Sequence, residues 1–186
     1  MSYIRKQGDS VGGELPDDEE FWSGSPFRWA AGAMDGAFSH HVAGGSKTAE
    51  SRKLVRLLAR HTRKPRIATR KAIYSMLLAL DVIGTIDDVL EEIRKDPGIH
   101  DRNLFDEAVW MVENAAHRNV VKFGIALLGL FRNESVKDLL LAVGGHEEFT
   151  LYAAVAIQNG MENANDVLFE LAKRVHGRGR IHIVER

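Results

Sequence analysis

Positive charge is concentrated in one short stretch of the sequence. Residues 51–71 contain nine Lys or Arg residues and no acidic residue. Within it, Lys53, Arg56, Arg60 and Lys64 recur every three or four residues, so they share one face of a helix expected over residues 47–62, or lie at its end. Leu54, Val55, Leu57 and Leu58 form the opposite, apolar face. Residues that extend this charge across the turn at Pro65 complete what we call the basic ridge: Lys53, Arg56, Arg60, Arg63, Lys64, Arg66, Arg70 and Lys71.

The basic ridge predicts binding of phosphates or nucleic acid, because clustered cations release the counterions of a polyanion. Two alternatives stay open. The ridge is a solvated surface, or it is neutralised within the molecule by the acids of residues 14–20 and 87–92. Aromatic residues do not interleave the ridge, which disfavours stacking of single-stranded bases.

A second group of cations lies near the C-terminus. Arg178 and Arg180 stand between His176 and His182, beside the turn residues Gly177 and Gly179. The pattern indicates an anion site at a turn between helices, with a solvated turn as the alternative.

Motifs for catalysis and metal binding are incomplete. Adjacent histidines on one helix, such as His40 and His41, point about 100° apart and cannot both face one ion unaided. His146 and Glu147 begin a zincin-like motif, but Thr150 stands where the second histidine is required. The chain has no cysteine, which excludes cysteine nucleophiles, disulfides and thiolate ligands. We therefore predict no catalytic residue, no cofactor and no metal.

The elements that position these residues are indicated by an internal repeat. Residues 73–80 align with residues 123–130 and, more loosely, with residues 152–159. Downstream of each segment, a polar residue precedes an aspartate by three positions. These pairs are Thr85 with Asp88, Ser135 with Asp138, and Asn163 with Asp166. An apolar helix, a turn and a capped second helix, repeated, predict an all-α fold of stacked helical hairpins.

The expected domain organisation follows from this repeat. Residues 1–24 lack periodicity and are predicted to form a flexible arm, and residues 25–186 a single helical-repeat domain with an irregular N-terminal cap. The clearest repeats span residues 65–96, 119–145 and 147–176, with an additional helix over residues 102–117. Residues 177–186 are predicted to begin a further helix, whose apolar face would be covered either by further repeats of a longer array or by a second copy of the chain. The second alternative predicts a homo-oligomer through the C-terminal repeat.

The layout of residues 65–186 resembles HEAT-like and armadillo-like helical repeats. The segments NVVKFGIALLGLF, HEEFTLYAAVAIQN and AKRVHGRGRIHIVER, from Asn119 onward, are similar to a family of uncharacterised bacterial proteins. Some members of that family carry the label limonene hydroxylase, which would imply an oxygen-activating cofactor.

Composition and the length of the apolar runs bear on where in the cell the protein is expected. The net charge is −1, and the longest unbroken apolar run, residues 123–131, is far shorter than a membrane span requires. We expect a cytoplasmic protein without membrane contact. Three functions remain, in decreasing order of expectation. These are a non-catalytic protein-interaction module, a nucleic-acid or phosphate-binding module that uses the basic ridge, and an enzyme of unknown reaction.

Overall fold

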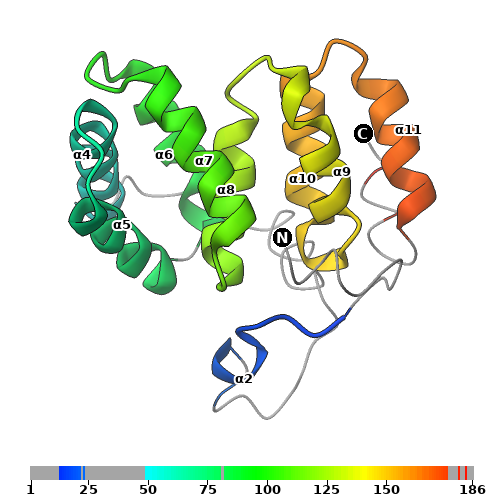
Figure 1. The fold of residues 1–186 in the computed structure, drawn as a ribbon, viewed down its shortest axis with the longest axis horizontal. Helices are drawn as coiled ribbons and strands as arrows, with labels where there is room; N and C mark the ends of the chain where they lie inside the picture. The colour runs from blue at the N-terminus through cyan, green and yellow to red at the C-terminus, as the bar shows by residue number, and fades with distance from the viewer. Residues whose placement is uncertain are drawn as a thin grey trace.

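The computed structural model describes residues 13–21, 23, 49–80, 82–175, 180 and 183. Every regular element among the described residues is helical, and they contain no strand, so the predicted all-α class is confirmed (Figure 1). The α-helices are α2 (Asp18–Phe21), α4 (Ala49–Arg63), α5 (Ile67–Ala79), α6 (Val82–Lys95), α7 (Asp101–Asn114), α8 (Arg118–Leu128), α9 (Lys137–Gly144), α10 (Glu147–Gly160) and α11 (Ala164–Arg174). A 3₁₀ turn, η1 (Glu134–Val136), leads directly into α9.

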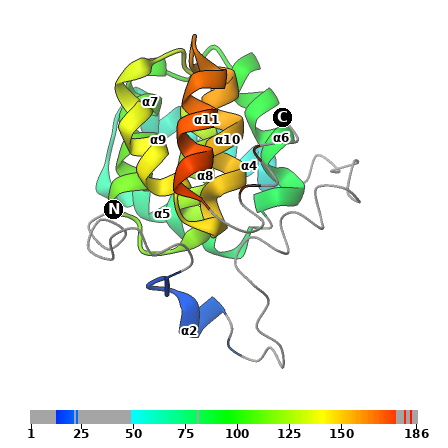
Figure 2. The ribbon, with the colours of Figure 1, turned by 90° about the vertical axis from the view of Figure 1, so that its right-hand side faces the viewer.

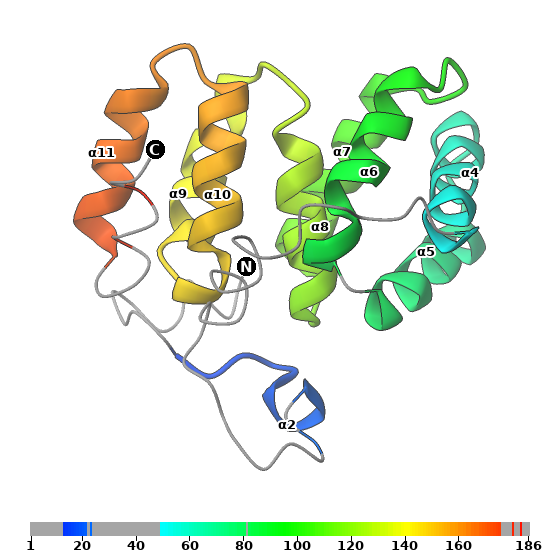
Figure 3. The same ribbon diagram turned by 180° about the vertical axis from the view of Figure 1, so that it is seen from behind.

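The helices pack in chain order from α4 and α5 at one end to α11 at the other (Figure 1). Helix α8 lies centrally and contacts α5, α6, α7 and α10, while α10 also contacts α9 and α11. Seen from behind, α10, α6 and α4 come to the front, and seen from the side, α11 covers one end while α2 lies below the other helices (Figures 3 and 2).

The central helices are buried because their sequences are apolar almost all round. Nine of the eleven residues of α8 are buried, and α10 likewise buries residues on all sides. Gly124 in α8 permits close packing against α7, since a Cβ added there would lie 2.8 Å from Met111 Cβ and 3.1 Å from the Ala108 carbonyl oxygen. Gly124 therefore allows α7 and α8 to approach each other closely.

The predicted repeat units differ from the closest helix packing. Residues 119–145 would pair α8 with α9. The most extensive packing instead joins α8 to α7 and α9 to α10. The additional helix predicted over residues 102–117 is α7 (Asp101–Asn114), which is thus a main packing partner of the central helix.

Two of the three predicted helix caps are wrong. Helix α6 already begins at Val82, so Thr85 lies inside it. The buried residues Val82, Ile86 and Val89 recur at helical spacing, so packing extends the helix beyond the expected cap.

At the second site, the cap is Asn133, whose side chain accepts a hydrogen bond from the Ser135 N–H at 2.9 Å. Ser135 itself lies within η1. Asn163 does occupy the N-cap of α11 with Asp166 in the first turn, but its side chain makes no capping hydrogen bond.

The described part of the expected flexible arm is docked. Leu15 and Asp17 are buried, and α2 follows directly. In the described part of the chain, no helix is both long enough and apolar enough to cross a bilayer.

Candidate functional site

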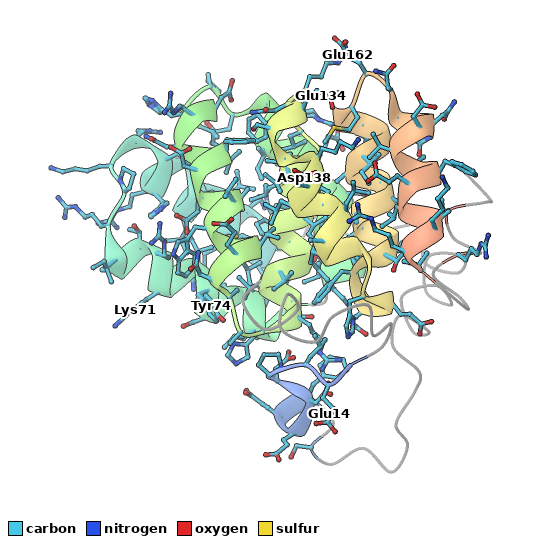
Figure 4. The ribbon with its side chains drawn as sticks, turned by 45° about the vertical axis from the view of Figure 1, so that its right-hand side comes forward. Glu14, Lys71, Tyr74, Glu134, Asp138 and Glu162 are labelled. Carbon is cyan, nitrogen blue, oxygen red and sulfur yellow. The ribbon has the colours of Figure 1, made fainter. Side chains whose placement is uncertain are left out.

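The basic ridge follows the outer face of α4 and continues across the turn into α5. Leu54 and Leu58 are fully buried on the opposite face, as the spacing predicts. Lys71 projects outward from α5 (Figure 4). The exposed members of the ridge are Lys53, Arg56, Arg60, Arg63, Lys64, Arg66 and Lys71.

Two predicted ridge residues are engaged within the molecule. Arg70 donates to Glu107 through Nε and Nη2, with Nη2 to Oε2 at 2.6 Å, and its guanidinium carbon lies 4.2 Å from the centre of the Trp110 ring. Arg63 Nε donates to the Gly98 carbonyl oxygen at 3.2 Å. Arg70 is therefore committed to holding α5 against α7, and Arg63 is partly tied to the loop before α7.

The other ridge cations make no ion pair with any residue that the structure describes. These are Lys53, Arg56, Arg60, Lys64, Arg66 and Lys71.

Four of the acids that could have neutralised the ridge are paired elsewhere. Asp17 and Asp18 bind Arg118, and Glu20 Oε2 lies 3.3 Å from His117 Nε2. Glu91 pairs with Lys95 on its own helix. For these acids, neutralisation of the ridge within the molecule is contradicted.

A first buried ionic cluster, which we call the Glu107 cluster, joins α4, α5 and α7. His61 Nε2 lies 2.9 Å from Glu107 Oε2, and His61 Nδ1 lies 2.7 Å from Thr69 Oγ1. The side chains of His61 and Glu107 are each 2% exposed. Because both side chains are buried, the cluster ties the three helices together.

A second buried ionic cluster, the Arg118 cluster, forms where the N-terminal segment meets α8 and α10. Arg118 Nε lies 3.2 Å from Asp17 Oδ2, and Nη2 pairs with Asp18. Lys122 Nζ lies 2.6 Å from Glu148 Oε1, which is also 3.7 Å from Arg118 Nη1.

Burial opposes the charged form of Arg118 and lowers its pKa. The hydrogen bonds that Arg118 donates to Asp17, and the charges of Glu148 and Asp17, raise that pKa. The pKa of Arg118 is raised overall, so the guanidinium is held charged in a buried site.

A pocket of about 180 Å³ lies beside the Arg118 cluster. Its lining residues are Asp17, Glu20, Phe21, Leu78, His117 and Asn119. His117 Nδ1 lies 2.8 Å from the hydroxyl of Tyr74, which in turn accepts a hydrogen bond from the Ala116 N–H. These contacts orient His117 against Glu20.

Sequence reasoning missed both clusters. His61 and Glu107 are 46 residues apart, and Asp17 and Arg118 are 101 apart, so no local spacing connects them. One signal was present: Lys122 interrupts the apolar helix 118–128, and a charge on an all-buried helix requires a buried partner.

The remaining predicted sites are only partly described. Arg180 is exposed, whereas Arg178, His176 and His182 lie outside the described residues, as do His40 and His41. Within the described ranges, no three His, Asp or Glu side chains gather as a set of metal ligands.

The described residues form an all-α structure with an exposed basic ridge on α4 and α5. One buried ionic cluster ties these two helices to α7, and the other joins the N-terminal segment to α8 and α10. No protein-family model, curated protein or solved structure matches the chain.

Proposed function

We propose that the chain is a non-catalytic, HEAT-like helical-repeat module that binds the phosphate backbone of nucleic acid through the basic ridge. The observation that carries the proposal is the pairing of Asp17, Asp18 and Glu20 with Arg118 and His117 instead of with the ridge. All ridge cations except Arg70 remain exposed, although the whole chain has a net charge of only −1.

The spacing of the ridge fits several phosphates at once. Lys53 and Lys64 are eleven residues apart in the sequence, which corresponds to about 16 Å along a helix. That length matches about five base pairs of duplex. A ligand held by four ridge cations gives a slope of about −3.6 in log K against log salt, and roughly 100-fold weaker binding at about 200 mM than at about 50 mM salt.

The same geometry predicts little sequence preference. Flexible cations on one outer helix face contact phosphates, which position a protein without reading bases. One face of the Trp110 ring is covered by the guanidinium of Arg70, so it offers no free stacking surface on that side. We expect duplexes of different sequence to bind with similar affinity.

The experiment is fluorescence anisotropy with a labelled DNA duplex, in a salt series, on the full chain and on the double variant Arg56→Glu, Arg60→Glu. The matched control is Arg132→Glu, Lys173→Glu, which makes the same change in net charge at exposed positions outside α4 and α5. We expect at least a 30-fold loss in the ridge variant and less than threefold in the control. Equal losses in both, or binding that does not respond to salt, would contradict the proposal.

A protein partner is the second candidate, and one observation favours it. Ile67 is 74% exposed in the first turn of α5, between Arg66 and Lys71. An exposed apolar side chain framed by cations suits an acidic protein surface with an apolar contact at its centre. In that case Ile67→Ser would abolish capture of the partner, whereas DNA binding would be unaffected by Ile67→Ser.

A further inference from the structure

We propose that Arg118 and Lys122 form a second anion site, which the chain's own residues 13–21 occupy and which an acidic peptide segment of a partner takes when they leave. The ligand class is a peptide with two adjacent carboxylates and a following aromatic residue. This site is separate from the basic ridge and does not depend on the function proposed for the ridge.

The site holds the side chain of Asp17 as a ligand pocket holds a carboxylate. Asp17 Oδ2 accepts from the backbone N–H of Arg118 at 2.8 Å, and both carboxylate oxygens lie within 3.3 Å of the Arg118 guanidinium. Asp18 binds the same guanidinium, and the Phe21 ring centre lies 3.9 Å from its central carbon. The side chain of Arg118 is 2% exposed, so the site is built into the fold and not a surface pair.

The charges of the cluster require an anionic ligand. Arg118 contacts the carboxylates of Asp17 and Asp18 closely, whereas Glu148 on α10 lies 3.7 Å from its Nη1. Without Asp17 and Asp18 the buried guanidinium loses both of its close carboxylate partners, and the N–H at the start of α8 loses its acceptor. Leaving a buried charge unpaired is strongly unfavourable, so the empty site favours any segment that supplies carboxylates.

The segment that fills the site is held mainly by polar contacts. Helix α2 has four residues, far too few to be stable by itself. Leu15 is the apolar side chain that the segment buries, whereas Phe21 stays 42% exposed. Gly13 contributes its carbonyl oxygen to His146 Nε2 at 2.8 Å.

The adjoining pocket shows that packing around the segment is incomplete. It opens between Phe21 of the segment and Leu78 of α5. A contact made by carboxylates and one apolar anchor can be replaced by another segment of the same chemistry, because the exchange restores every ionic bond. The tethered segment competes at an effective concentration on the order of millimolar, so a free peptide binds well only after the segment has been displaced.

The test uses the full-length chain and a labelled peptide with the sequence of residues 13–21, GELPDDEEF. The segment is released by the double substitution Asp17→Asn, Asp18→Asn, which removes both carboxylates. We expect this variant to bind the peptide at least tenfold more tightly than the unchanged chain. A control peptide with asparagine at both aspartate positions should bind at least tenfold more weakly to the same variant.

A second variant guards against loss of fold. Leu15→Ser removes the apolar anchor and leaves every charge of the site in place, and circular dichroism checks that both variants remain helical. The Leu15→Ser variant should also bind the peptide more tightly than the unchanged chain does. Peptide binding that is equal for the unchanged chain and both folded variants, or equal for the two peptides, would overturn the proposal.

Discussion

From the contacts of the Glu107 cluster we predict how much the free energy of unfolding falls when Glu107 is replaced. Replacing Glu107 with alanine leaves His61 buried without its carboxylate partner and removes the carboxylate that Arg70 binds on α7. Loss of a hydrogen bond to a charged group costs about 1.5–3 kcal/mol. The Arg70 contact adds only about 0.5–1 kcal/mol because its side chain is 32% exposed. The lost side-chain methylene contact contributes about 1 kcal/mol, so we expect the free energy of unfolding to fall by about 4 kcal/mol.

The neighbouring residue provides the control. Asp106 lies on the same helix, is 60% exposed and pairs with Arg102 at 3.7 Å, with the Arg102 side chain 91% exposed. An exposed pair of this kind contributes about 0.3–0.5 kcal/mol. Glu107→Gln keeps the shape and one acceptor oxygen, so its cost should lie between those of Asp106→Ala and Glu107→Ala.

Urea denaturation followed by circular dichroism measures all three variants. The dependence on denaturant should stay unchanged while the midpoint of Glu107→Ala falls. If Glu107→Ala and Asp106→Ala lower the free energy of unfolding to the same extent within 1 kcal/mol, the cluster does not hold the three helices together and the reasoning fails.

Two further predictions concern the packing of α8 and the surface of α11. Gly124→Ala would place a Cβ 2.8 Å from Met111 Cβ, so despite the better helix propensity of alanine we expect a net loss of about 1–2 kcal/mol; a raised melting temperature would contradict the overlap. The pKa of Glu170 is lowered mainly by the hydrogen bond that Lys137 donates, and further by the charge of Lys137 and by Arg174. The stability that these contacts contribute is therefore present above the ordinary glutamate pKa and is lost as the pH falls through the lowered value. Denaturant midpoints measured across the acidic range should show a shallower acid loss in Glu170→Gln than in the unchanged chain, and identical profiles would count against the contact.

The spacing of residue types along the sequence predicted which helix faces are buried and which are exposed. The spacing of basic and apolar residues placed both faces of α4 correctly, and continuous apolar runs identified the buried helices α8 and α10. Cap positions were less predictable, since Thr85 has the right residue type but α6 starts earlier because Val82 packs in the core. Within the ridge, nothing local to Arg70 indicated that Glu107 would remove it from the exposed set.

The N-terminal acids Asp17 and Asp18 pair with the buried cation, for which desolvation is costly, and not with the surface on which cations are most numerous. A solvated arginine such as Arg56 loses little when it has no partner, because water screens its charge. A buried arginine such as Arg118 loses several kcal/mol without one. Asp17 and Asp18 therefore stabilise the fold more by binding Arg118 than they would by lying against a ridge with many more cations. The same preference leaves the ridge exposed, so the buried cluster and the free cationic surface are two consequences of one electrostatic balance.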